Sequence, residues 1–160
     1  MAAGETLKIA WQANDEVNGA LIEHLDAAML QARTPGGGMT VAEHLAHITG
    51  TVKHWGMELK PDRLAELPDL AERVGDQWIP ETDTGRIGQV ARETRTVALA
   101  EAVNAPAGER GELPHASPEM YLIHMLVHDA HHRGQILLAL KTSGHALPDE
   151  ESMWHPWRAG

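Results

Sequence analysis

The residues of this chain best suited to chemistry lie in the stretch His128-Asp129-Ala130-His131-His132-Arg133-Gly134-Gln135. Here His128 and His132 stand four positions apart inside a long apolar helical pattern. Side chains four apart on a helix share a face, and their Cβ atoms lie roughly 5 to 6 Å apart. Two imidazoles placed in this way can converge on one metal ion at about 2.0 to 2.1 Å each. The spacing therefore predicts a metal site, and a third ligand must come from elsewhere.

A second group of histidines, His44 and His47, offers that third ligand. His44 lies nearer the centre of the apolar stripe of its helical segment, whereas His47 lies at the edge of the stripe. We take His47 as the candidate, but helix geometry alone does not choose between the two. The ordinary alternative for all these imidazoles is internal hydrogen bonding, because an unpaired polar group in a protein interior costs about 1 to 3 kcal/mol.

The composition narrows the chemistry. The 160 residues include no Cys, so the chain has no thiolate nucleophile and any metal must rest on His, Asp or Glu. The net charge of −10 argues against a broad nucleic-acid surface, which needs clustered Lys and Arg. The first nine residues lack the pattern of a secretory signal, and no apolar run approaches the roughly 20 residues that span a bilayer. We expect one cytoplasmic, soluble domain over residues 1–160 that binds neither nucleic acid nor membrane.

Four amphipathic segments are long enough to form the body of this domain. The second segment opens with Thr40 and Glu43, which have the spacing of a capping box, and the fourth opens with Ser117-Pro118, a typical helix start. Gly144 is placed to close the fourth segment. Apolar residues recurring at three- and four-residue steps predict helices over about residues 5–33, 41–59, 85–103 and 118–142.

The connections between these segments complete the predicted fold. Pro61, Pro68, Gly75 and Pro80 interrupt the stretch after the second helix, which we expect to be a crossover with one short helix around residues 64–74 and no strand. The tail carries Trp154 and Trp157, which should pack back over the helices. The sequence thus predicts an all-α fold, a four-helix bundle with a long crossover connection, and bundle interiors often hold metal sites.

Further polar side chains surround the histidine face of the fourth segment. His124 and His131 flank the site and could carry protons, although we prefer to interpret them as ordinary histidines at the rim of the bundle. Gln135 projects from the same face, where it could contact a substrate or make a helix–helix hydrogen bond. None of the three is assigned a role in catalysis.

Three other residues are also considered. Asp129 and Glu43 could accept a hydrogen bond from the distal N–H of a ligand imidazole. Neither is assigned to the site, because Asp129 points about 100° away from its neighbour His128 and Glu43 already has a capping role. Arg133 lies well round the helix, where we expect an ion pair or a contact in a dimer.

Motifs spread over nearly the whole chain are similar to those of one family. They are Trp11 and Asn14, the stretch from Thr40 to Ile48, the stretch from His128 that ends in His-Arg-Gly-Gln, and Leu147-Pro148 followed by Trp154. Together they resemble the DinB-like family of damage-inducible, YfiT-related metalloenzymes. The resemblance implies a four-helix bundle that often forms homodimers. It places the metal ligands on His47, His128 and His132, and so chooses against His44.

The resemblance also implies a class of reaction, because better understood relatives are S-transferases or isomerases that use small thiols such as bacillithiol or mycothiol. Three neutral imidazoles leave open positions on a metal ion, which can stabilise a thiolate or a bound hydroxide. We expect a divalent metal, zinc or nickel first and iron as a further option. The leading hypothesis is a metal-dependent transferase that directs a small thiol, or water, at a small electrophile. The alternatives are a metal-dependent hydrolase without thiol and a non-catalytic stress-response module that binds metal.

Overall fold

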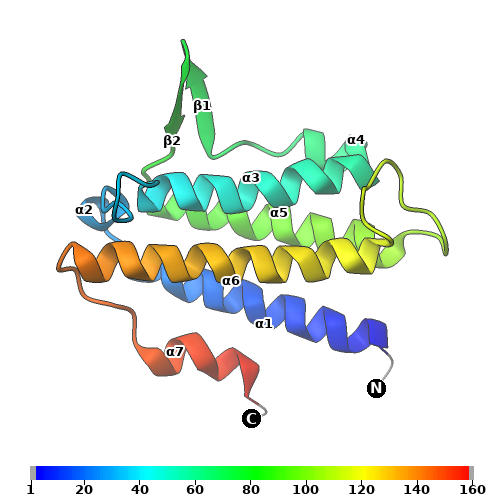
Figure 1. Ribbon diagram of the computed structural model, residues 1–160. Coiled ribbons are helices and arrows are strands. Elements are labelled where there is room, and N and C mark those ends of the chain that lie inside the picture. Colours follow the sequence, from blue (N-terminus) through cyan, green and yellow to red (C-terminus); the bar gives the residue numbers. More distant parts are fainter. Residues whose placement is uncertain (1–2, 159–160) are drawn as a thin grey trace.

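The computed structural model describes residues 3–158, and most of these residues are helical. Four long helices lie side by side and form the body of the molecule (Figure 1). They are α1 (Ala3–His24), α3 (Val41–Leu59), α5 (Thr84–Asn104) and α6 (Pro118–Thr142). Each of the pairs α1–α5, α1–α6, α3–α5 and α3–α6 is in contact. None of the described helices is long and apolar enough to cross a membrane.

Three of the predicted long helices form with nearly the predicted bounds. The capping box at the start of α3 is complete: Thr40 Oγ1 accepts from the Glu43 N–H at 3.1 Å, and Glu43 Oε2 accepts from the Thr40 N–H at 2.6 Å. At the start of α6, Ser117 Oγ accepts from the Met120 N–H at 3.3 Å. These local bonds satisfy backbone donors that a helix leaves free, which explains why the sequence located both starts correctly.

The first predicted helix is shorter than expected. It ends at His24, and the chain restarts as the one-turn α2 (Ala27–Leu30). Asp26 causes the break, because its side chain accepts from the Met29 N–H at 2.8 Å and so caps the new turn. The prediction of one helix to Arg33 was therefore wrong. The apolar pattern continues through the break because both parts pack on the same core.

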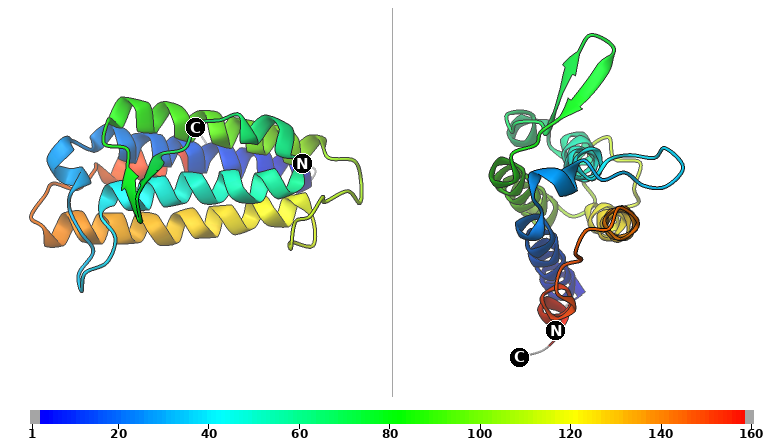
Figure 2. Two further views of the ribbon diagram at one scale, coloured as in Figure 1. Left: turned by 90° about the horizontal axis from the view of Figure 1, so that it is seen from above. Right: turned by 90° about the vertical axis from the view of Figure 1, so that its left-hand side faces the viewer.

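The connection between α3 and α5 differs most from the prediction. A short helix, α4 (Pro61–Ala65), comes first, and an antiparallel hairpin of β1 (Ala71–Val74) and β2 (Gln77–Pro80) follows. The hairpin stands away from the helices (Figures 1 and 2). Gly75 has a φ of +61° in its two-residue turn. The dipeptide Gly75-Asp76 between two four-residue segments, AERV and QWIP, is a hairpin turn that the sequence analysis missed.

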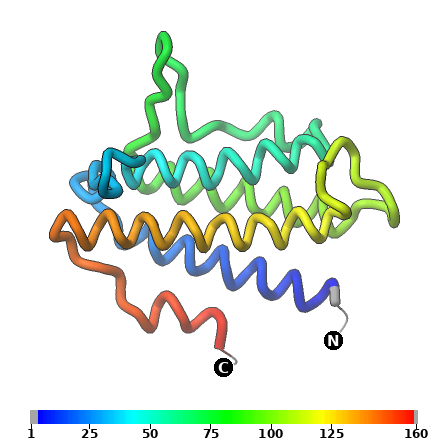
Figure 3. The backbone as a smooth tube through the Cα atoms, viewed as in Figure 1, coloured from blue at the N-terminus to red at the C-terminus, as the bar shows by residue number. Residues whose placement is uncertain are grey.

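The tail returns along α1, as the chain path in Figure 3 shows. It forms α7 (Glu150–Trp154) and a 3₁₀ turn, η1 (His155–Trp157), and both contact α1. Met153 packs against the core, but Trp154 and Trp157 stay largely exposed. The tail therefore packs back as expected, although its two tryptophans contribute little of the buried surface.

Candidate metal centre

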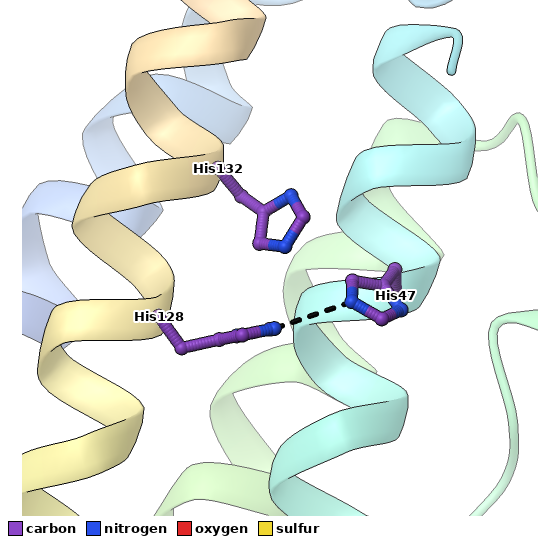
Figure 4. Close-up of side chains that lie close together, drawn as sticks. All are labelled: His47, His128 and His132. Atoms are coloured by element: carbon purple, nitrogen blue, oxygen red, sulfur yellow. Dashed lines mark hydrogen bonds between the residues drawn. The ribbon is translucent and has the colours of Figure 1, made fainter. Parts of the chain in front are cut away.

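The three predicted ligands come together between two helices. His47 extends from α3, and His128 and His132 extend from consecutive turns of α6 (Figure 4). One nitrogen from each ring can be chosen so that all three lie within 4.8 Å of one another. The Nε2 atoms of His47 and His128 are 3.2 Å apart. Residues 81 positions apart in the sequence thus form one cluster.

The spacing of this cluster suits a divalent metal ion. Two nitrogens bound to one tetrahedral ion at about 2.0 to 2.1 Å are separated by about 3.3 Å. The 3.2 Å between the Nε2 atoms of His47 and His128 is close to that value. Imidazole nitrogens are ligands that zinc, nickel, iron and copper all accept. The donor set therefore fits a metal, and three protein ligands leave a position on the ion for another molecule.

The electrostatic setting keeps these imidazoles neutral. Burial lowers the pKa of His47 and His128. Burial, reinforced by repulsion from His128, His47 and His44, lowers the pKa of His132 to about 3. Protonation is unfavourable because the charged form loses solvation and meets other imidazoles that would carry the same charge. Neutral rings keep the lone pairs that a metal requires.

His44 lies behind the cluster instead of within it. Its side chain is fully buried, and its Nδ1 lies 2.9 Å from Nδ1 of His132. This hydrogen bond occupies one nitrogen of His132 and leaves Nε2 as its available ligand atom. His44 thus orients a candidate ligand, and it is buried, whereas His47 of the same helix lies at the exposed edge.

Asp129 lies on the other side of α6, in a buried polar network. Its Oδ2 accepts from the Nδ2 atoms of Asn14 at 2.7 Å and Asn18 at 3.0 Å, and Nη1 of Arg95 lies 2.6 Å away. Arg133 Nη1 donates to the Oδ1 atoms of the same two asparagines, at 2.6 and 2.7 Å. The network joins α1, α5 and α6. Arg133 therefore does not form the expected ion pair among the described residues, since the hydrogen bonds of its Nη1 go to amide oxygens.

The remaining flanking residues form two local pairs. Gln135 Nε2 lies 2.6 Å from His131 Nε2. His124 Nδ1 lies 2.8 Å from Nε2 of His115, a residue that the sequence analysis did not consider. His115 lies in the loop between α5 and α6, which is tied to the end of α3 where the Glu112 N–H donates to Glu58 O at 2.8 Å. No periodicity within that loop could have predicted the contact.

A cavity of about 770 Å³ opens beside the cluster. His47 and His128 form part of its wall, and His124 lines it as well. The remaining wall comes from α3, from the hairpin and from Met39 before α3. Its volume is in the range of sites for small molecules. The histidine cluster is thus accessible to a small compound.

These observations define a helical protein with a cluster of three histidines that could hold a metal ion beside a ligand-sized cavity. The chain belongs to the DinB family, whose model matches residues 2–159. No curated protein and no solved structure matches the chain.

Proposed function

We propose that this protein is a metal-dependent transferase that joins a low-molecular-weight thiol to a small electrophile. The convergence of His47, His128 and His132 at the wall of a cavity is the observation that carries the proposal. A divalent metal, zinc or nickel first, would be held by these three residues. Membership of the DinB family supports the four-helix bundle with a crossover connection as the scaffold.

When bound, the metal would supply a cation that favours thiolate over thiol near neutral pH. The chain contains no Cys, so the sulfur must belong to a substrate. In the proposed reaction the thiol loses its proton, its sulfur forms a bond to carbon, and the leaving group of the electrophile departs with the bonding electron pair. We place this reaction in the cytoplasm, where small thiols are kept reduced.

His124 is our candidate to receive the thiol proton. His124 lines the cavity that His47 and His128 also line, and it is hydrogen-bonded to His115. Burial lowers the pKa of His115, so this partner is neutral at pH 7. An imidazole that is hydrogen-bonded to another imidazole can accept a proton and share it with that partner. His124 is therefore our choice for the base.

Metal binding is the first test of this function. Purified protein should hold close to one zinc or nickel ion per chain, measured by elemental analysis after loading and desalting. The variant His132→Ala should lose most of this metal, because two imidazoles hold an ion much less tightly than three. His155→Ala is the matched control, since His155 is an exposed histidine outside the cluster. Full metal retention in His132→Ala would rule out the site.

Turnover is the second test. A panel of small thiols is incubated with electrophiles, with and without a chelator, and thioether formation is followed by mass spectrometry. The proposal expects product only when thiol and metal are both present. Product formed by hydrolysis without thiol would instead identify the metal-dependent hydrolase. Tight metal binding without turnover of any substrate would favour a non-catalytic module.

We also propose that two copies of the chain associate through the outer face of α6. This face carries exposed apolar or small residues at steps of three or four positions, the spacing found where two helices pair. Lys, Arg, Asp and Glu are absent from it although the whole chain has a net charge of −10, so two copies can approach here with little repulsion. The residues of this α6 seam are Met120, Ile123, Val127, Ala130, Gly134 and Leu138.

Gly134 adds a second observation to the α6 seam. Glycine inside a helix is destabilising by about 1 kcal/mol relative to alanine. A Cβ at Gly134 would have no described atom within 4 Å, so packing within the chain does not require glycine there. A missing side chain on an exposed helix does allow another backbone to approach closely.

Light scattering coupled to size exclusion tests this association. The wild-type protein should elute with twice the chain mass, and Val127→Glu should elute as a monomer because it places a charge in the α6 seam. Val127 is 65% exposed, so the monomer should fold normally. Val103→Glu, at a 50% exposed valine on α5, should remain dimeric. A monomeric wild type, or a dimeric Val127→Glu, would contradict the proposal.

A further inference from the structure

We propose that the cavity beside the histidine cluster binds an uncharged aromatic compound between Trp55 of α3 and Trp78 of the hairpin. This inference rests on the proposed function, because it assigns the chemical class of the electrophile. It is carried by three separate features of the cavity: its aromatic walls, the charges that line it and an unexplained glycine. None of the three depends on the presence of a metal.

The hairpin contributes one of the two aromatic walls. In the antiparallel register, Trp78 faces Arg73 and Pro80 faces Ala71, so these four residues share one face of the hairpin. Three of them, Ala71, Trp78 and Pro80, line the cavity. Trp78 is nevertheless 63% exposed. Such a large apolar ring left in contact with water is typical of a surface that a ligand covers.

The second aromatic residue of the wall, Trp55, comes from α3. Trp55 lines the cavity together with His54, whose ring is 4.8 Å from the Trp55 ring between centroids. Trp55 packs on the core with its other side, which holds the indole in place. The wall of the cavity thus contains one fixed indole and one exposed indole, and both can contact a flat ring, since aromatic pairs prefer stacked or edge-to-face contacts.

The charges of the cavity disfavour an anionic compound. Among the residues described, no Lys or Arg lines it, whereas Glu43 does. Hydrogen bonds from Thr40 lower the pKa of Glu43, so this carboxylate is ionised at pH 7. Arg73 shares the face of Trp78, but its Nε donates to Gly75 O at 3.2 Å, toward the turn and away from the cavity. In the metal-free protein an anion would meet this carboxylate, whose cationic partner Arg33, 3.5 Å away, does not line the cavity.

Gly50 supplies the third feature. It lies in the middle of α3, lines the cavity, and would have no described atom within 4 Å of an added Cβ. The fold therefore does not require glycine at this position, although glycine weakens the helix by about 1 kcal/mol relative to alanine. Its effect is to keep the cavity wide next to His47. Space for a ligand explains why glycine is present at position 50, whereas packing within the chain does not.

A matched pair of fluorescent probes tests the inference. N-phenyl-1-naphthylamine is uncharged, and 1-anilinonaphthalene-8-sulfonate has the same rings with one added negative charge. Both are titrated against the chelator-treated full chain, so that only the side chains of the wall act on the probe, and binding is followed by probe emission. We expect the neutral probe to bind at least tenfold more tightly than the sulfonate. Equal affinity, tighter binding of the sulfonate, or no binding of the neutral probe would overturn the inference.

Two pairs of variants locate the bound probe. Trp78→Ala should weaken binding of the neutral probe by about tenfold through lost ring contacts. Ile79→Ala, at the next residue on the opposite face of the hairpin, should leave binding unchanged. Gly50→Leu should weaken binding at least tenfold by placing a side chain in the cavity next to His47, whereas Gly4→Leu, at an equally open helix position on α1, should not alter it. Unchanged binding in both Trp78→Ala and Gly50→Leu would place the probe elsewhere and refute the inference.

His132→Ala separates this inference from the proposed function. His132 belongs to the histidine cluster but does not line the cavity. The variant should therefore lose the metal and still bind the neutral probe. Metal retention in this variant would contradict the proposed metal site alone. Loss of probe selectivity in a protein that binds metal normally would contradict the aromatic site alone.

Discussion

Two sides of α6 differ in what their polar residues contact, although these residues come from one short stretch, 128–132. Toward α3, His128 and His132 direct nitrogens at His47, and the cluster opens onto a cavity. Toward α1 and α5, the intervening Asp129 is fully buried, accepts hydrogen bonds from amide N–H groups and forms an ion pair with Arg95. The side toward α3 leaves lone pairs available to an added molecule, and we call it the open side. The side toward α1 and α5 pairs its charges within the chain, and we call it the closed side.

This difference separates a binding site from a structural network. Buried charges are tolerated when they are paired, and Arg95 is paired twice, with Asp129 at 2.6 Å and with Asp15 at 3.0 Å. Those contacts tie α5 to α1 and α6 and fix the rotation of α6 about its axis. The rotation decides which way the histidines point. The closed network therefore positions the open cluster without touching it.

The largest effect should follow from breaking the closed side. Asp129→Ala leaves the buried Arg95 without its nearest counter-charge, and loss of one partner of a buried pair typically costs about 3 to 5 kcal/mol. Since domains are stable by about 5 to 15 kcal/mol, much of the stability should be lost. Urea denaturation followed by circular dichroism measures the change in the free energy of unfolding.

Two comparisons sharpen this prediction. Asp76→Ala, at a fully exposed aspartate in the hairpin turn, should change stability by less than about 0.5 kcal/mol. Metal-free His132→Ala should stay folded, because its change is on the open side. If Asp129→Ala were as stable as Asp76→Ala, the network would have no structural role and the contrast between the two sides of α6 would fail.

A smaller effect should follow from loosening the open side while its three ligands stay in place. In His44→Leu, the Nδ1 of His132 loses its hydrogen-bond partner, so the ring is free to rotate. Loss of such a supporting partner typically weakens metal binding by about 10- to 100-fold. Competition with a chromophoric chelator measures the zinc affinity of the folded variant.

Two variants serve as matched controls, one at another histidine of α3 and one with a different substitution of His44. His54→Leu, at an exposed histidine of α3, should keep the wild-type zinc affinity. His44→Gln should retain part of the lost affinity, because an amide oxygen can still accept from His132. Wild-type affinity in His44→Leu would show that packing alone orients the ligand ring.

Much of the helical fold could be predicted because its determinants are local. The bounds of α3 and α6 follow from Thr40, Glu43 and Ser117, whose side chains bond within one turn. The break at Asp26 was hidden because apolar residues continue on both sides of it. The hairpin at Gly75 was missed because short strands carry few residues in which alternation can be recognised.

The site could be predicted only in part for a similar reason. The four-residue spacing on α6 fixed two candidate ligands, but helix geometry left His44 and His47 open, because it does not give the rotation of α3 against α6. The family resemblance made that choice. That rotation depends on contacts such as the bond from Asn14 to Asp129, between residues 115 positions apart. His115 lies in an irregular loop, and Trp78 lies on the hairpin that was missed. Their approach to the site depends on how these segments pack, which no local pattern in the sequence shows.

The smallest expected effect is a dependence of stability on pH, which comes from the histidines on the open side of α6. In the metal-free protein, burial holds the pKa of His132 at about 3, below the ordinary value of 6.5. The pKa values of His44, His47 and His128 are lowered too. The unfolded chain therefore binds more protons than the folded chain once the pH falls below about 6.5. Stability should be complete above that pH and should decline progressively as the solution becomes more acidic.

Urea midpoints of the chelator-treated protein at pH 7.5, 6.5 and 5.5 measure this decline before most carboxylates begin to titrate. In His132→Gln one of the responsible imidazoles is gone, so the midpoint should fall less over the same interval. His155→Gln, at an exposed histidine, should follow the wild type. A midpoint that rises toward pH 5.5, or an equal decline in His132→Gln and wild type, would mean that the cluster is not held neutral by its surroundings. The open side of α6 would then lack the free lone pairs that distinguish it from the closed side.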